Sequence, residues 1–322
     1  MTEPNNALGT TRSTPEQALP AKFSAKSAGS SCRSATSFHD GGVLTLTPRK
    51  CRWAAVLLAL VLPAGAGWAA TPADEVTAAW QLVADHLGRD AYAKLDRLAG
   101  PPTREQAFAQ AVVAIDYQPV TQQRLQEAEA VFGQLARGDD EIAAAAAYLQ
   151  ARMYQVHYQQ QDYSRAAALF LALAVRQPHS HWAQLGLVNA GLLLLYALPE
   201  PARPADRIAA AEALLPRLEE KKLWRDLQLQ LGRAGTFYEQ PLDTVLPHLL
   251  AADRVGGLVG QVNADLLASI GELSLRAGHY AQARTYFERY LREDTYNMRR
   301  VTVRRRLEDL AALEAKAREG KP

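Results

Sequence analysis

The segment that decides the fold class is Ala264–Tyr296, with the sequence ADLLASIGELSLRAGHYAQARTYFERYLREDTY. It divides into two stretches of helix-forming residues, with a turn at residues 278–280 between them. In the second stretch Ala283, Phe287 and Leu291 recur at i, i+4 and i+8, which places them on one face of a helix. The small Ala283 allows the first helix to approach closely, and Phe287 fills the space beside it. The segment therefore predicts two helices packed as one unit.

Related units precede this one along the chain. Their markers are Ala166 with Phe170 in the unit 147–178, Trp182 with Leu185 and Gly186, and Trp224 with Leu227. Together these residues resemble the tetratricopeptide repeat, whose pattern is W-x2-L-G-x2-Y, then A-x3-F, then P. The first position of that pattern falls at Gln150, Trp182, Trp224 and Leu267, spaced by 32, 42 and 43 residues. Because the family repeats about every 34 residues, the resemblance implies a right-handed α-solenoid of helix-turn-helix repeats with irregular spacing.

The rest of the chain after residue 69 favours the same architecture. It is rich in Ala, Leu, Glu, Gln and Arg and lacks long β-branched runs, a composition that favours helix. Turn signals at residues 100–102, 138–140, 199–204 and 256–257 separate expected helices of about 12–18 residues. An earlier A-x3-F pair, Ala128 and Phe132, indicates a degenerate unit before residue 140. We expect residues 70–322 to form one all-α, helical-repeat domain.

Residues 48–69 have the three parts of a secretory signal peptide. Basic residues at 49, 50 and 52 precede an apolar stretch over 53–62, and small residues at 67 and 69 suit cleavage after Ala69. We expect an exported protein of the periplasm. The alternative is an uncleaved anchor in the inner membrane formed by residues 53–70, because this uncharged stretch approaches the length of a membrane span.

Residues 1–47 are expected to be a disordered extension. They are rich in Ser, Thr, Ala and Pro and show no apolar periodicity. Secretory signals begin at an N-terminus, so we hypothesise that the start is assigned too early and that translation begins at Val43 or Leu46. An intact-mass measurement that finds residues 1–42 in a cellular precursor would contradict this hypothesis.

Charge and cysteine content exclude several classes of protein. The net charge is +2, and the residues after position 70 carry 29 Lys and Arg against 31 Asp and Glu. Nucleic-acid binding needs a dominant basic field, so no nucleic-acid partner is expected. Both cysteines, Cys32 and Cys51, precede the expected cleavage site, which leaves no disulfide or cysteine metal site in the remaining chain.

The body contains no motif of catalysis or cofactor binding. G-x-S-x-G, G-x-x-x-x-G-K-[ST] and H-E-x-x-H are absent, and the glycine-rich Arg254–Val262 follows no expected strand. That segment is interpreted as a connection between two helices. His179 and His181 are interpreted as part of a solvated turn, because no third metal ligand lies near them. We expect no catalytic residue, no cofactor and no metal.

Two further segments are interpreted as structural. The apolar Leu185–Leu198 has 14 residues, too few for a membrane span, and is expected to be a centrally buried helix. The arginine-rich Arg299–Arg306 is expected to belong to a capping helix, and the alternative is a surface for an acidic or phosphate-bearing partner. The apolar stripe of that helix would be Val303, Leu307 and Leu310.

The resemblance also implies where a partner binds. In tetratricopeptide proteins ligands lie in a concave groove lined by the first helices, so exposed positions of those helices are candidate binding residues. Carried onto this sequence they are Tyr148, Gln155, Tyr158, Gln159, Lys222, Arg225, Arg233, Asp265, Glu272 and Arg276. The middle of this set is basic, which suits an extended peptide with an acidic portion. We expect an exported scaffold that binds a partner protein or peptide without catalysis.

Two other functions remain open. One is a glycan-binding or regulatory helical-repeat protein of cell-envelope machinery, in which Tyr148, Tyr158 and Trp182 would stack on sugars. The other is an enzyme resembling the α/α barrels that cleave glycans, which needs two facing carboxylates about 5–10 Å apart. The sequence nominates no such pair. Membrane contact is expected only through the signal segment, if it stays uncleaved.

Overall fold

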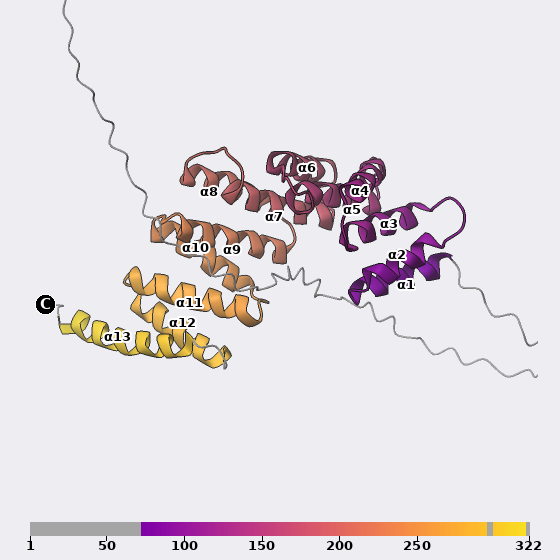
Figure 1. The fold of residues 1–322 in the computed structure, drawn as a ribbon. Coiled ribbons are helices and arrows are strands. Elements are labelled where there is room, and N and C mark those ends of the chain that lie inside the picture. The colour runs from indigo at the N-terminus through magenta and orange to yellow at the C-terminus, as the bar shows by residue number, and fades with distance from the viewer. Residues whose placement is uncertain (1–71, 295–298, 320–322) are drawn as a thin grey trace, which may run out of the picture. The chain divides into compact units, whose positions relative to one another are not determined.

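The computed structural model describes residues 72–294 and 299–319 of the chain (Figure 1). These residues are helical and contain no strand, so the all-α prediction is confirmed for this part of the chain. The expected extension 1–47, the signal peptide 48–69 and the alternative anchor 53–70 lie outside the described residues. Within the described ranges, no helix combines the length and the apolar character that crossing a membrane requires.

Thirteen α-helices follow one another in the described residues. They are α1 (Pro72–Ala84), α2 (Gly88–Asp96), α3 (Arg104–Asp116), α4 (Gln122–Leu135), α5 (Glu141–Arg152), α6 (Tyr163–Arg176), α7 (His181–Tyr196), α8 (Pro204–Glu212), α9 (Lys221–Phe237), α10 (Leu242–Val255), α11 (Gly260–Arg276), α12 (Tyr280–Glu293) and α13 (Arg299–Glu319). A π-helical turn, η1 (Met153–His157), continues α5, and a 3-10 turn, η2 (Leu215–Arg217), follows α8. A glycine-rich connection was predicted over 254–262. The structure confirms it between α10 and α11 but limits it to residues 256–259, because the two ends of the predicted segment belong to the helices.

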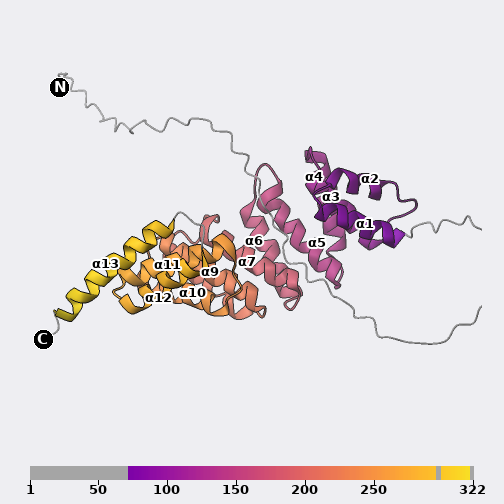
Figure 2. The same ribbon diagram turned by 90° about the horizontal axis from the view of Figure 1, so that it is seen from below.

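Consecutive helices pack in pairs, from α1 with α2 to α11 with α12, and α13 packs against α12 (Figures 1 and 2). The degenerate unit expected before residue 140 is the pair α3–α4. The first helices of successive pairs also pack on one another, as α1 on α3, α3 on α5, α5 on α7 and α7 on α9. The first helices α9 and α11 do not pack on one another to the same extent, because α11 packs mainly on α10 and α12. We call the region between two successive first helices a joint. With nine residues each, α2 and α8 are shorter than expected.

Local capping residues explain where several helices begin. Thr103 accepts a hydrogen bond from the backbone N–H of Gln106, whose side chain accepts one from the N–H of Thr103 in return. This capping box opens α3. Asp140, Asp162 and Ser180 accept from backbone N–H groups at the starts of α5, α6 and α7. These side chains satisfy donors that have no partner inside the helix.

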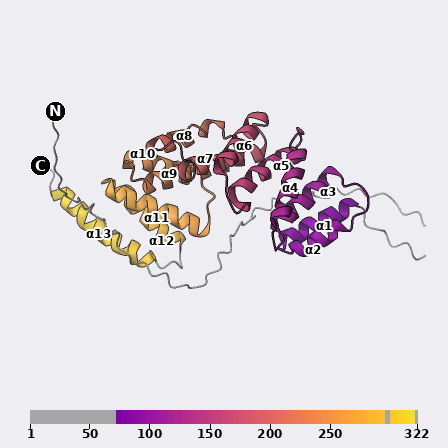
Figure 3. The same ribbon diagram turned by 45° about the horizontal axis from the view of Figure 1, so that its top comes forward.

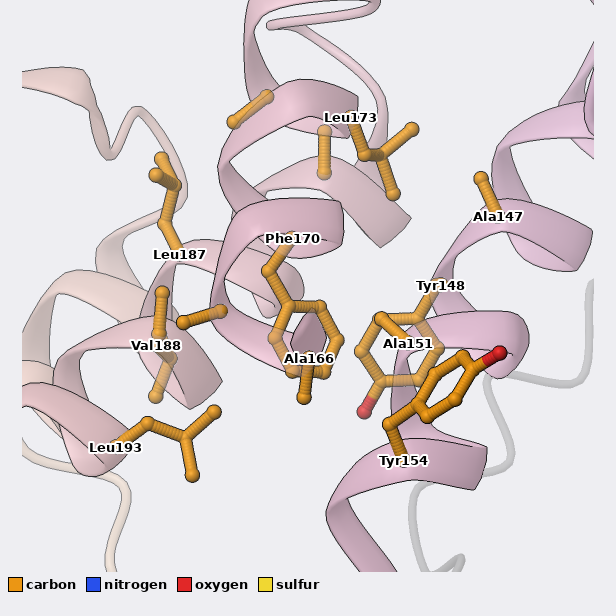
Figure 4. Close-up of a cluster of buried hydrophobic side chains, with 14 of the residues drawn as sticks. Ala147, Tyr148, Ala151, Tyr154, Ala166, Phe170, Leu173, Leu187, Val188 and Leu193 are labelled. Atoms are coloured by element: carbon orange, nitrogen blue, oxygen red, sulfur yellow. The ribbon is translucent and has the colours of Figure 1, made fainter. Parts of the chain in front are cut away.

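Small residues let adjacent helices approach one another closely. Phe170 is fully buried on α6, between Tyr148 of α5 and the helix α7 (Figure 4). A Cβ atom added at Gly186 of α7 would lie 3.2 Å from the Phe170 ring. In the pair α11–α12, a Cβ atom at Gly271 would lie 2.5 Å from the ring of Phe287. At both places a glycine of one helix therefore meets a phenylalanine of the adjacent helix.

Two structural interpretations of the sequence are confirmed. The apolar helix α7 packs against α5, α6, α8 and α9 (Figure 3). Nine of its residues are buried. On α13, Val303 and Leu310 are buried, and Leu307 packs beside them against the apolar side chains of α11 and α12.

Candidate functional site

The side chains of the candidate binding residues differ in their exposure to solvent. The prediction that all of them are exposed is wrong for four side chains, namely Tyr148, Gln155, Tyr158 and Arg225, which are only 6–8% exposed. Asp265 and Glu272 are half-buried, and the exposed members are Gln159, Lys222, Arg233 and Arg276. The burial has identifiable causes, because each of the four buried side chains takes part in a polar network between helices. A role of the exposed residues in binding stays a prediction.

One of these networks joins the end of α5 to α7. The Arg152 guanidinium donates to the side-chain oxygens of Gln155, at 2.9 Å, and of Asn189 on α7, at 3.3 Å. The Asn189 amide in turn donates to the Tyr148 hydroxyl at 3.3 Å. Burial raises the pKa of Tyr148, and burial together with the nearby Arg152 lowers the pKa of His157. Gln155 and Tyr148 therefore face α7 and not the solvent.

A second network surrounds the π-helical turn η1. The hydroxyls of Tyr154 and Tyr158 both donate to the Glu129 carboxylate on α4. Arg165 of α6 pairs with the same carboxylate at 3.4 Å and lies over the Tyr154 ring, 4.0 Å from its centroid. Burial, and then the bond to Glu129, raises the pKa of both tyrosines. Tyr158 therefore ties α5 to α4, whereas Gln159, one residue later, lies exposed in the connection to α6.

Arg225 is buried because it holds the connection between α10 and α11. Its guanidinium donates to the carbonyl oxygen of Gly256 at 2.8 Å and to the Asp226 carboxylate at 2.9 Å. The Gly256 carbonyl belongs to a turn with positive φ, where no helix bond satisfies it. The arginine therefore has a structural role in this connection.

The acidic candidates on α11 bind arginines of α13. Asp265 pairs with Arg299 at 2.6 Å, and Glu272 pairs with Arg306 at 3.1 Å and with Arg276 at 3.5 Å. In these ion pairs, arginines of the same chain balance the negative charge of both carboxylates.

His179, in the turn before α7, and His181, the first residue of α7, each face a carboxylate. The Nδ1 atom of His179 lies 2.8 Å from Glu219, and that of His181 lies 2.9 Å from Glu220. Each pair is separate, and no group of three or more metal-ligating side chains is found in the described residues. His179 lies in the solvated turn that was predicted for both histidines, whereas His181 is the first residue of α7. Both side chains are largely exposed.

The joint between α9 and α11 contains a half-open pocket of about 240 Å³. One helical stripe of α9 faces it, at positions i, i+4, i+7 and i+8. The lining residues are Leu229, Arg233, Thr236 and Phe237 from α9, Leu249 from α10, and Asp265, Leu266 and Ser269 from α11. Two of the candidates, Arg233 and Asp265, are thus brought together, whereas the other eight do not line this pocket.

An exposed aromatic cluster lies next to the pocket. Phe237, at the end of α9, is 70% exposed and contacts Tyr196 of α7 and Tyr238, with ring centroids 5.9 and 4.9 Å away. The Tyr238 hydroxyl donates to the carbonyl oxygen of Leu195 at 2.5 Å, which fixes its ring against α7. We call Tyr196, Phe237 and Tyr238 the aromatic cluster.

Sequence reasoning missed the aromatic cluster and most of the pocket lining. Phe237 stands at the end of α9, beyond the Trp224 and Leu227 marker of that helix, and Tyr196 stands at the end of α7, just before the turn signal at 199–204. The available signal was the stripe on α9, since the apolar Leu229 and Phe237 share a face with Arg233. That pattern alone does not reveal that α11 leaves the face uncovered.

Sequence comparison with protein-family models and curated proteins finds no match for this chain. The resemblance to the tetratricopeptide repeat stays a prediction made from its residues.

Proposed function

We propose that this protein is an exported scaffold that binds an extended peptide or partner protein on the faces of its first helices, without catalysis. The proposal includes a right-handed, tetratricopeptide-like arrangement of the helix pairs and cleavage of the signal after Ala69. The observation that carries it is the exposed aromatic cluster beside a pocket between two first helices, α9 and α11. A large, solvent-exposed aromatic side chain at the edge of a pocket is typical of a protein-interaction site.

The repeated packing of helix pairs supports the same proposal. Each pair buries its apolar face against its neighbours, and the first helices carry exposed polar side chains such as Arg233 and Arg276. The glycan-binding alternative loses support, because the rings of Tyr148 and Tyr158 are buried. Trp182 is half-buried and packs against Tyr148, with the ring centroids 5.4 Å apart.

Photo-crosslinking in cells tests the proposed function. A photoreactive amino acid is placed at Gln159, Arg233, Phe237 or Arg276, and at Val175 on the second helix α6 as a control. Val175 is 75% exposed, so its accessibility matches that of Phe237. We expect crosslinks to a defined partner protein from the four test positions, and binding of that purified partner to the purified chain. Crosslinks that are equally frequent from Val175, or a partner that fails to bind in purified form, would contradict the scaffold.

Export is tested separately by the mass of the mature chain. We expect the protein in the periplasmic fraction to begin at Ala70. A protein that retains residues 53–70 in the membrane fraction would favour the anchor instead.

A further inference from the structure

We infer that the pocket between α9, α10 and α11 receives one leucine- or phenylalanine-sized side chain of an extended peptide, while Arg233 binds a carboxylate next to that side chain. This inference rests on the proposed function and adds the chemistry of the ligand.

The volume fits a single side chain. At about 240 Å³ the pocket exceeds the cavity of about 150 Å³ that accommodates a benzene molecule in an engineered protein core. It is smaller than the roughly 300–1,000 Å³ that is typical of sites for drug-sized molecules and cofactors. A leucine or phenylalanine side chain therefore fits inside it, whereas a drug-sized cofactor is larger than the pocket.

The residues that line the pocket suit an apolar side chain that is attached to a peptide backbone. Leu229, Leu249 and Leu266 are each at most 6% exposed and supply apolar walls from three helices. The hydroxyls of Thr236 and Ser269 lie among the lining residues, on α9 and α11. Thr236 already donates to the carbonyl oxygen of Gly232 at 2.9 Å, which leaves its oxygen as an acceptor for a peptide N–H.

The charge of the pocket favours an anion. Arg233 is exposed and forms no hydrogen bond or ion pair with the residues that the structure describes. Asp265, on the opposite wall, is compensated by Arg299 at 2.6 Å. The uncompensated charge at the pocket is thus the guanidinium of Arg233. A guanidinium binds a carboxylate through two parallel hydrogen bonds, and this geometry gives both affinity and orientation.

Phe237 extends the site beyond the pocket. Its ring is held by Tyr196 and Tyr238 and offers its remaining surface to a neighbouring residue of the ligand. The occupant is therefore a peptide segment of another protein with an apolar side chain, an adjacent acid and an extended backbone. A second copy of the chain and the chain's own residues 1–71 are the competing occupants, and the experiment separates them.

Fluorescence anisotropy of labelled peptides on the full chain tests the inference. The probe is the octapeptide GSSFDDSG, and its two comparison peptides replace the phenylalanine by serine or both aspartates by asparagines. We expect the probe to bind about tenfold more tightly than either comparison peptide, which corresponds to about 1.4 kcal/mol. Added salt should reduce the advantage over the asparagine peptide and leave the advantage over the serine peptide.

Two variants and two matched controls locate the binding. Arg233→Glu should remove the preference for aspartate, and Ser269→Trp should fill the pocket and remove the preference for phenylalanine. Arg176→Glu makes the same charge change at an exposed arginine of α6, and Val175→Ser removes an equally exposed apolar side chain. Both controls should retain both preferences, and circular dichroism should show the same helix content in all four variants.

Three results would overturn the inference. The first is that the probe shows no preference, or that Arg233→Glu and Ser269→Trp leave its preferences unchanged. The second is a dimer in sedimentation velocity that Ser269→Trp dissociates, which assigns the pocket to a second copy. The third is that the double variant Phe38→Ser, Asp40→Asn binds the probe more tightly than the unchanged chain does, which assigns the pocket to the chain's own N-terminal residues. A partner captured from Gln159 or Arg276 alongside any of these results would leave the proposed function intact, whereas no captured partner would remove the function itself.

Discussion

The joint between α7 and α9 and the joint between α9 and α11 connect the same kind of elements, yet one is closed and the other contains a pocket. At the closed joint, Leu227 of α9 is fully buried against Gly191 of α7, where an added Cβ atom would lie 2.6 Å from the leucine. The Tyr238 hydroxyl also bonds to the carbonyl oxygen of Leu195 on α7. A glycine opposite a leucine thus allows the two helices to meet.

At the open joint, charged side chains stand on both facing stripes. Arg233 on α9 requires hydration or an ion partner, and Asp265 on α11 is held in its ion pair with Arg299, so these faces do not form an apolar contact. The two pairs are held instead through α10, whose Asp253 accepts hydrogen bonds from Tyr286 and Arg289 of α12, each at 2.8 Å. The comparison teaches that the closed joint places a glycine opposite a leucine, whereas the joint with charged side chains on its facing stripes contains the candidate binding site.

The largest expected effect is a difference in lost stability between a leucine of the closed joint and a leucine in the wall of the pocket. Leu227→Ala should lower the free energy of unfolding by about 2–5 kcal/mol, because it leaves a cavity in a fully packed contact. Leu229→Ala should cost less, because one side of Leu229 already faces the pocket and lacks packing partners there. Urea unfolding followed by far-UV circular dichroism measures both. Equal losses would mean that the pocket is closed in solution.

The second prediction concerns the glycine of the closed joint. Gly191→Ala should destabilise the protein by about 1–2 kcal/mol, because overpacking of about 1–3 kcal/mol outweighs the gain of up to about 1 kcal/mol in helix propensity. The matched control is Gly133→Ala in α4, where the nearest atom is the mobile amide end of Gln150 at 3.1 Å. This control should be neutral or stabilising by up to about 1 kcal/mol. The same sign for both variants would contradict the close approach of α7 and α9.

The third prediction uses pH to weaken the open joint. Burial, and then the bond to the Asp253 carboxylate, raises the pKa of Tyr286 to about 12. In the unfolded chain a tyrosine ionises near its ordinary pKa of about 10. The raised pKa therefore contributes stability that is complete below about pH 10 and is lost as the pH rises toward 12.

Tyr286→Phe isolates this contribution. At pH 8 the variant should be less stable by about 1–2 kcal/mol, the typical cost of removing a partly buried hydrogen bond. The difference in unfolding free energy between the two proteins should shrink between pH 10 and 12. A difference that stays constant over this range would show that Tyr286 ionises as freely in the folded protein as in the unfolded chain.

The smallest expected effect is at the mouth of the pocket. Phe237→Ala should change the free energy of unfolding by less than about 0.5 kcal/mol, because its ring is 70% exposed. A loss above about 1 kcal/mol that grows with protein concentration would mean that a second copy covers the ring. The measurement is thermal unfolding at two protein concentrations that differ by a factor of about 50.

Sequence reasoning was accurate where the information is local. The burial of α7 follows from a run of apolar residues on all its faces, and the stripe on α13 follows from the spacing of Val303, Leu307 and Leu310. It failed for side chains whose surroundings come from other helices. Tyr158 was expected in a groove but binds Glu129, and Arg225 was expected in solvent but binds the Gly256 carbonyl.

The sequence by itself determined the all-α class, the helix pairs and many of their boundaries, because propensity, apolar period and caps act within a few residues. Only the tertiary structure decided which faces of the first helices meet solvent and where two of them stay apart. Those outcomes depend on side chains brought together from helices more than 30 residues apart, such as Arg233 with Asp265. The exposure of a helix face is set by what packs against it, and no local pattern encodes the neighbour.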